Sequence, residues 1–198
     1  MIKPLIILLL FFFSVSGHES SLLDEVRSTL NNIKPFKVSF VQQVYIDEEL
    51  EIEESGTILV KDISHLKWIY LNPDLKIFLM QGNTYQFFDK ENNQLIIGKI
   101  VEEKQRWIWQ LLFSEKITDG VKCDRLSKRI IIKKEDEELD FEVFIGNQML
   151  PEKVVQYDTS GAKYIYYFNN YKKRVKIAQK DFQLELPEDV EIIDGNLD

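Results

Sequence analysis

Side chains that could catalyse a reaction or hold a metal ion are scarce in this sequence. Its 198 residues include two histidines, His18 and His65, and one cysteine, Cys123. These are too few for a His- or Cys-based metal site, and the sequence has no glycine-rich phosphate loop and no nucleophile-elbow motif. We therefore expect that the protein is not an enzyme and uses no cofactor.

Acidic residues are abundant, but they gather where the chain is expected to turn. The main run is DEELEIEE at residues 47–54, and a second acidic stretch spans residues 135–138. A calcium site in the first run is an alternative, although calcium loops alternate their ligands and include a glycine, which this run lacks. We interpret both runs as the solvated ends of hairpins.

Aromatic and aliphatic side chains are the main resource of the chain. It contains 13 Phe, 8 Tyr and 3 Trp, and 44% of its residues are hydrophobic. Such a composition suits a protein that buries apolar material rather than one that transforms it.

The first 17 residues have the pattern of a secretory signal peptide. Lys3 precedes a continuous apolar run from Leu5 to Phe13, and small residues follow at positions 15–17. The run is shorter than the roughly 20 apolar residues of a spanning helix, although an uncleaved membrane anchor is an alternative. We expect cleavage and export, which leaves residues 18–198 as one domain.

The exported chain is acidic. Without Lys3 it carries 24 basic and 33 acidic residues, a net charge of about −9. Such a surface repels phosphate, so binding of nucleic acid and docking on anionic lipid are disfavoured. The single Cys123 cannot form an internal disulfide. We expect its side chain to be buried and inert, and a thiol free for intermolecular pairing is the alternative.

Residues 21–34 have the clearest helical pattern. Ser21 and Asp24 have the spacing of a capping box, and apolar residues recur every three or four positions as far as Ile33. Pro35 ends the pattern. The apolar stripe of this helix should face the core.

After Pro35, short strands follow one another with only turns between them. Strands are predicted at 36–46, 56–61, 65–71, 75–81, 85–88, 94–100, 121–126, 128–133, 139–145, 149–157 and 163–169, with a short addition at 175–177. No helices alternate with these strands, so the sheet should be antiparallel. The fold class is therefore mainly β with helices, in one large curved sheet.

Residues 102–113 (EEKQRWIWQLLF) break the alternation and predict a short helix. From Trp107 onward this helix is apolar almost all round, so several of its sides must be covered. A buried helix that plugs one end of the sheet is one interpretation. A movable lid, whose covering is sometimes a ligand, is the other.

Several motifs resemble the periplasmic outer-membrane lipoprotein carriers, the LolA family. In the family's order these are FVQ at 40–42, GTILVK at 56–61, Trp68 with Pro73, GNTY at 82–85, QYDTSG at 156–161 and DFQLELPEDVEIID at 181–194. The resemblance covers nearly the whole chain after residue 17. It implies an incomplete, unclosed antiparallel β-barrel with a helical lid, and the strand pattern above gives this barrel about eleven strands.

The resemblance also implies a function and partners. Family members are periplasmic carriers that bind lipoprotein acyl chains in an apolar cavity. They take outer-membrane lipoproteins from an inner-membrane ATP-driven releasing complex and hand them to an outer-membrane acceptor. That acceptor is itself a lipoprotein, and the absence of a Cys near the predicted cleavage site favours the soluble carrier. A monomer is expected.

The expected acyl-chain-binding residues combine the apolar face of the strands with the 102–113 segment. They are Phe40, Ile58, Leu66, Trp68, Tyr70, Phe87, Trp107, Ile108, Leu111 and Leu112. Leu66 is also expected to be exposed at the cavity rim and to contact a partner, because the family has a larger aromatic residue there.

One position departs from the family pattern. The family usually has Arg-Pro after the strand that ends near Lys61, and that Arg hydrogen-bonds the lid closed. This chain has Asp62-Ile63, and an ionised Asp can only accept hydrogen bonds. We therefore expect no latch centred on Asp62. The lid would be held by burial of apolar side chains or latched through Lys61, His65 or Lys67.

Two other functions on the same fold stay open. One is a periplasmic sensor, which would need a further domain. The other is a binding protein for glycolipid or another apolar ligand without a role in lipoprotein transport.

Overall fold

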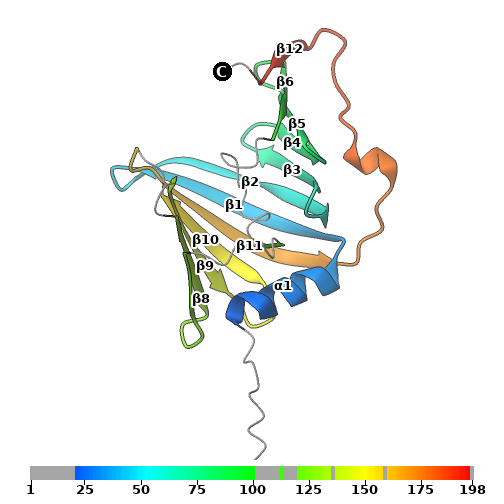
Figure 1. Cartoon of the computed structure of the whole chain (residues 1–198). Helices are drawn as coiled ribbons and strands as arrows, with labels where there is room; N and C mark the ends of the chain where they lie inside the picture. The colour runs from blue at the N-terminus through cyan, green and yellow to red at the C-terminus, as the bar shows by residue number, and fades with distance from the viewer. Residues whose placement is uncertain (1–20, 101–111, 114–119, 135–136, 158–159, 197–198) are drawn as a thin grey trace, which may run out of the picture.

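A computed structural model describes residues 21–100, 112–113, 120–134, 137–157 and 160–196. The predicted signal peptide and most of the 102–113 segment lie outside these residues. Figure 1 shows one strongly curved sheet with a helix, α1, lying across one end of it.

Within the described residues, twelve strands form the sheet, in the spatial order β12-β6-β5-β4-β3-β2-β1-β11-β10-β9-β8-β7. Their bounds are β1 Phe36–Ile46, β2 Glu49–Asp62, β3 His65–Asn72, β4 Lys76–Gln81, β5 Thr84–Asp89, β6 Gln94–Lys99, β7 Val121–Asp124, β8 Arg129–Lys134, β9 Glu137–Ile145, β10 Pro151–Tyr157, β11 Lys163–Lys173 and β12 Glu191–Asp194. Because β12 and β7 are both edges, the barrel is unclosed. The predicted fold class is confirmed, with one strand more than expected.

The last strand, β12, was not predicted. It pairs with β6 in parallel, whereas the other ten strand pairs are antiparallel. The amide of Glu191 donates to the carbonyl of Asn93 at 2.9 Å, and that of Gly195 to Ile97 at 2.8 Å. The strand predicted at 175–177 is wrong: the described chain there is irregular and leads into a short 3-10 helix, η1 (Gln179–Phe182).

Helix α1 (Leu22–Ile33) has the predicted capping box. The amide of Asp24 donates to Ser21 Oγ at 3.1 Å, and the amide of Ser21 donates to Asp24 Oδ2 at 3.1 Å. Its apolar stripe is buried, as predicted. The end of the helix is tied to the chain after β11, because the Arg174 amide donates to the Ile33 carbonyl at 2.9 Å.

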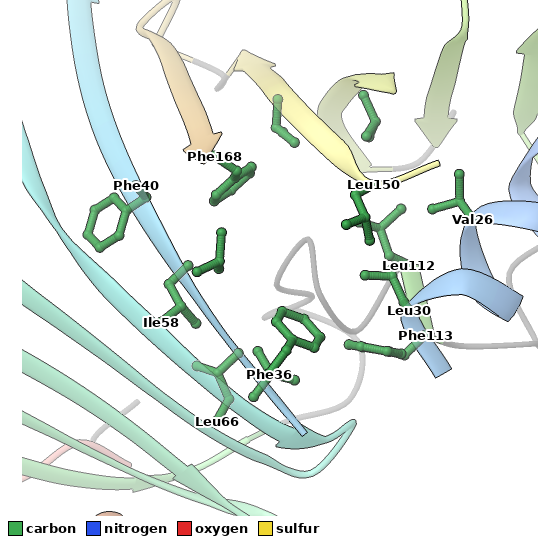
Figure 2. Close-up of a cluster of buried hydrophobic side chains, with 14 of the residues drawn as sticks. Val26, Leu30, Phe36, Phe40, Ile58, Leu66, Leu112, Phe113, Leu150 and Phe168 are labelled. Carbon is green, nitrogen blue, oxygen red and sulfur yellow. The ribbon is translucent and has the colours of Figure 1, made fainter. Parts of the chain in front are cut away.

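The core lies between α1 and the face of the sheet that the helix covers. Figure 2 shows Val26 and Leu30 of α1 beside Leu112, Phe113 and Leu150, with Phe36 nearby. The ring centroids of Phe36 and Phe113 are 6.4 Å apart. Leu112 and Phe113 are thus part of the layer that packs with α1 against the sheet.

Two expectations about the surface need correction. Residues 47–53 are exposed, as a solvated hairpin end should be, but Glu54 is only 8% exposed. Glu54 is the last residue of the run, and it lies opposite Gln42 of β1, which is also buried. Cys123 is exposed rather than buried, because it lies on β7, the four-residue edge strand.

Candidate functional site

One apolar row crosses seven strands of the sheet on the face toward α1, which we call the inner face. Directly opposite pairs are Phe40–Phe168, Ile58–Trp68, Trp68–Phe78, Phe78–Phe87 and Phe87–Ile96. Opposite residues in a sheet share a face, so these side chains all lie on one face from β11 to β6. The row shifts between β1 and β2, where Phe40 lies opposite Gly56 and Ile58 lies opposite Val38. Figure 2 shows Phe40, Ile58, Leu66 and Phe168 directed toward a common interior. The alternation of apolar residues in the sequence produces this row.

Aromatic rings are concentrated at the centre of the row. Phe40 meets the rings of Trp68 and Tyr70 edge-on, each with a centroid distance of 5.1 Å. Trp68 stacks on Tyr70 at 6.1 Å and meets Tyr166 edge-on at 5.7 Å. These contacts join β1, β3 and β11 into one aromatic cluster.

Gly56 makes room for this cluster on β2. A Cβ atom at Gly56 would lie 1.9 Å from the carbonyl oxygen of Ile69 and 3.0 Å from the ring of Phe40. A side chain here would therefore force the strands and the Phe40 ring apart.

The predicted binding residues divide into three groups. Phe40, Ile58 and Trp68 are buried on the inner face, and Leu112 is buried in the layer beside α1. Tyr70 and Phe87 are half-buried and pack against the same cluster. Trp107, Ile108 and Leu111 lie outside the described residues. The structure thus brings the strand residues together on one face.

The expected exposure of Leu66 is wrong. Its side chain is 2% exposed and belongs to the core, opposite Val60 on β2 and Met80 on β4. Leu66 shares the inner face with Trp68 because the two are two positions apart on β3. It therefore cannot act as a rim contact in this conformation.

A polar cluster ends the aromatic part of the inner face, and sequence reasoning missed it. Lys76 Nζ donates to Glu54 Oε1 at 2.8 Å, Gln42 Nε2 donates to Glu54 Oε2 at 3.5 Å, and the Tyr70 hydroxyl donates to Gln42 Oε1 at 3.0 Å. These four residues come from the adjacent strands β1 to β4. The available signal was Gln42, which interrupts the inward apolar positions Phe40 and Val44 of β1.

Burial and charge shape this polar cluster. The side chain of Glu54 is 10% exposed and that of Lys76 is 29% exposed. The hydrogen bond to Glu54 raises the pKa of Lys76, and nearby Asp89 and Asp74 add to the effect. Burial raises the pKa of Tyr70 well above its usual value. At neutral pH the cluster therefore holds a charged Lys76 and a neutral phenol.

Asp62 takes its described hydrogen bonds within its own turn between β2 and β3. Its Oδ1 accepts from the amide and the hydroxyl of Ser64 at 2.9 Å each and lies 2.9 Å from His65 Nδ1. His65 and Lys67 face the outer side, where the His65 ring meets Phe182 edge-on at 6.2 Å. Lys67 Nζ donates to the carbonyl of Gln183 at 2.8 Å. These two side chains hold the C-terminal segment.

Other kinds of site find little support in the described part of the chain. It contains no group of three or more His, Cys, Asp or Glu side chains that could hold a metal ion. None of its helices is long and apolar enough to cross a membrane. A pocket of about 510 Å³ lies near the β9–β10 turn, lined by Asn147, Gln148, Leu150, Glu152, Asn169, Asn170 and Tyr171. Its lining is mostly polar, although Leu150 belongs to the hydrophobic core and Tyr171 packs against that core.

Comparison with known proteins gives consistent relatives over most of the chain. An outer-membrane lipoprotein carrier protein of Francisella tularensis subsp. tularensis (strain WY96-3418) is 24% identical, with 97% of each chain covered. One from Pseudoalteromonas translucida (strain TAC 125) is 26% identical, with 85% of each covered.

Solved structures share the fold at low identity. A LolA superfamily protein from Nitrosomonas europaea has a TM-score of 0.52 at 12% identity, covering 82% of this chain and 96% of that one. An uncharacterized conserved protein from Thermus thermophilus has a TM-score of 0.56 at 13% identity, covering 87% and 96%. The family model described as "Outer membrane lipoprotein carrier protein LolA" matches residues 31–185. The chain therefore belongs to the LolA family of outer-membrane lipoprotein carrier proteins.

Proposed function

We propose that this protein is a periplasmic lipoprotein carrier that binds acyl chains on the inner face of its sheet. The observation that carries the proposal is the row of apolar side chains on the inner face, which extends from Phe168 on β11 to Ile96 on β6 and shifts by one inward position at Gly56 of β2. Family membership supports the cargo class. Signal-peptide cleavage and export belong to the same proposal.

No catalyst is needed for such a task. Enclosing one buried CH₂ group is worth about 0.8 kcal/mol against water, so one acyl chain supplies roughly 10 kcal/mol. Transfer from one apolar surface to another changes this energy little. Energy would be spent at extraction, by an inner-membrane ATP-driven complex, and release would proceed to an acceptor at the outer membrane.

The face must open before it can bind. Phe40, Ile58 and Trp68 are each at most 2% exposed in this conformation, so a chain cannot reach them without movement of the layer that covers them. Residues 102–113 would be the moving part, and Trp107, Ile108, Leu111 and Leu112 would contact the chain. Protein with no cargo would thus hide its apolar lining.

A lipopeptide titration tests the proposal. We would measure binding of a synthetic tripalmitoyl-cysteinyl peptide and of its deacylated form, and we expect binding of the acylated form only. Phe87→Ser removes a half-buried ring from the inner face and should weaken binding about tenfold, because burying such a side chain is worth roughly 1.5–3 kcal/mol.

The matched control is Gln86→Ser, which changes the neighbouring residue on the other face of β5. This variant should bind as the wild type does. Equal binding of the acylated and deacylated peptides would refute the proposed function. Co-purification of free lipid without lipoprotein would favour a general apolar-ligand binding protein.

A further inference from the structure

We propose that the polar cluster of Gln42, Glu54, Tyr70 and Lys76 binds the ester- and amide-bearing head of the acylated ligand. It would thereby fix the direction in which the chains lie on the inner face. This inference rests on the proposed function and adds to it the position and chemistry of the head group.

The cluster lies at the boundary between apolar and polar surface. Tyr70 belongs to both sides, since its ring stacks on Trp68 while its hydroxyl donates to Gln42. Beyond the cluster, β1 and β2 continue into a hairpin whose residues 47–53 are exposed and largely acidic. An amphiphile whose chains cover the aromatic cluster would therefore place its head at these four residues.

The apolar surface between the cluster and α1 is long enough for an acyl chain whose head lies at the cluster. Phe36, next to α1, and Gln42 are six residues apart on β1, which corresponds to roughly 20 Å at about 3.3 Å per residue. One layer of acyl chains in a bilayer occupies about 15 Å, half of the hydrocarbon core. Once the face has opened, the distance from the cluster to α1 would be long enough for one acyl chain with its methyl end toward the helix.

The Glu54–Lys76 ion pair is partly buried, with side chains 10% and 29% exposed, and stability alone does not explain its position. Removing two charges from water costs about as much as their attraction returns, so apolar residues would hold β2 and β4 together at least as well. The pair does offer hydrogen-bonding groups. Lys76 has three N–H donors, of which Glu54 takes one, and the Tyr166 hydroxyl beside Trp68 has no hydrogen-bond partner among the described residues.

These donors match the carbonyl oxygens of an acylated head. Ester and amide carbonyls are acceptors, and their desolvation on binding would be offset by hydrogen bonds from Lys76 and Tyr166. Glu54 and the carbonyl oxygen of the Gln42 side chain can accept from an amide N–H of the cargo. The acylated, amide-linked cysteine of a lipoprotein presents both kinds of group.

Charge discriminates further among amphiphiles. Lys76 is already neutralised by Glu54, and the carboxylates of Asp89 and Asp74 act on the same ammonium. An anionic head would have to displace Glu54 and approach the two aspartates. The cluster should therefore prefer neutral or cationic heads to phosphatidylglycerol and free fatty acid.

The test compares two neighbouring carboxylates that face opposite ways. Glu54→Gln combined with Lys76→Met removes the inward ion pair, while Glu53→Gln changes the outward Glu53, which bonds Gln43 at 2.7 Å. The probes are a neutral tripalmitoyl-cysteinyl peptide, palmitate, dipalmitoyl phosphatidylglycerol and diphenylhexatriene, an apolar dye without a head group. Binding would be measured for each variant at one fixed salt concentration.

We expect the double variant to bind the lipopeptide about tenfold more weakly, because hydrogen bonds to charged groups are the stronger class. Its binding of diphenylhexatriene should not change, and its preference for lipopeptide over phosphatidylglycerol and palmitate should shrink. Glu53→Gln should match the wild type with every probe. If the double variant does not fold, Tyr70→Phe is the alternative, because it removes one hydroxyl of the cluster. We then expect a smaller loss of lipopeptide affinity and again no change in binding of diphenylhexatriene.

Three results would overturn the inference. The first is unchanged lipopeptide binding, the second an equal loss for lipopeptide and dye, and the third tighter binding of phosphatidylglycerol than of lipopeptide by the wild type. The proposed function fails separately, if the wild type does not distinguish acylated from deacylated peptide.

Discussion

Leu66 is the residue for which the predicted exposure differs most clearly from the exposure in the structure. A resemblance to the family places it at a rim, yet its side chain is 2% exposed between Val60 and Met80. Leu66→Ala should lower the free energy of unfolding by about 2–5 kcal/mol, as large-to-small changes in a core do.

Leu71, on the same strand and 51% exposed, supplies the control. Leu71→Ala should stay within about 0.5 kcal/mol of the wild type. Urea denaturation of both variants measures the difference. A Leu66 variant as stable as the Leu71 variant would show that Leu66 is not core.

The hydrogen bonds that Asp62 accepts in its own turn should make the free energy of unfolding depend on pH. Burial would raise the pKa of this carboxyl, but hydrogen bonds from His65 and Ser64 outweigh burial and lower it. The folded pKa thus lies below the unfolded value of about 3.9. The resulting stability is present above that unfolded value and is lost as the pH falls through the folded pKa.

Asp62→Ala should therefore lower the free energy of unfolding by about 0.5–1.5 kcal/mol at pH 7, and the difference from the wild type should shrink toward pH 3. Because the described partners of Asp62 all lie in its turn, affinity for lipopeptide should not change. Thermal unfolding from pH 3 to pH 7 gives the first result. A variant that binds lipopeptide much more weakly would indicate that Asp62 takes part in closure.

Among the elements, α1 depends on its N-terminal cap. Ser21→Ala removes the side-chain acceptor for the Asp24 amide, and we expect a loss of about 1 kcal/mol of stability. Ser28→Ala, at an exposed position inside the helix, should be neutral or slightly stabilising because Ala is the better helix former. Equal effects of the two changes, measured by urea denaturation, would exclude the cap as the cause.

Local sequence patterns predicted the helix and those strands that pair with the next strand along the chain. Alternation at Leu66, Trp68 and Tyr70 gave the right face, and the capping box at Ser21 gave the right helix start. The parallel strand β12 was missed because its partner, β6, is almost one hundred residues earlier and no turn connects them. The strand has only four residues, Glu191–Asp194, and two of them are acidic, so its composition does not predict a strand.

The polar cluster was missed for a different physical reason. Glu54 ends a run of acids that is otherwise exposed, and Lys76 follows a turn, so both have the composition of surface residues. Only the register, which sets Gln42 opposite Glu54 and Tyr70 opposite Lys76, brings them to one place. Sequence spacing within one strand cannot reveal a contact that spans four strands.

For the molecule as a whole, ligand binding should appear as stability. A ligand that binds only the folded state adds about 2.7 kcal/mol at one hundred times its dissociation constant. For a chain of this size that corresponds to a rise in Tm of roughly 5–10 °C. Calorimetry with the tripalmitoyl peptide should show this rise and the deacylated peptide should not. An unchanged Tm at saturation would mean that the acylated peptide does not bind the folded protein.

The position of β1 in the sheet has a consequence for how the protein folds. Strands β1 to β6 follow one another in both sequence and space, so this half can form through local hairpins. The other neighbour of β1 is β11, and Phe40 pairs with Phe168, 128 positions later in the chain. Contacts of such high contact order form slowly, because a long loop must close first.

A chain that emerges from its N-terminus would therefore expose an unpaired, apolar edge along β1 until β11 arrives. Exposed strand edges promote association between chains. Newly made molecules would thus depend on a holding chaperone, or on low concentration, until β11 pairs with β1. Under the proposed function, a protein that shields acyl chains would itself need shielding before its own sheet is complete.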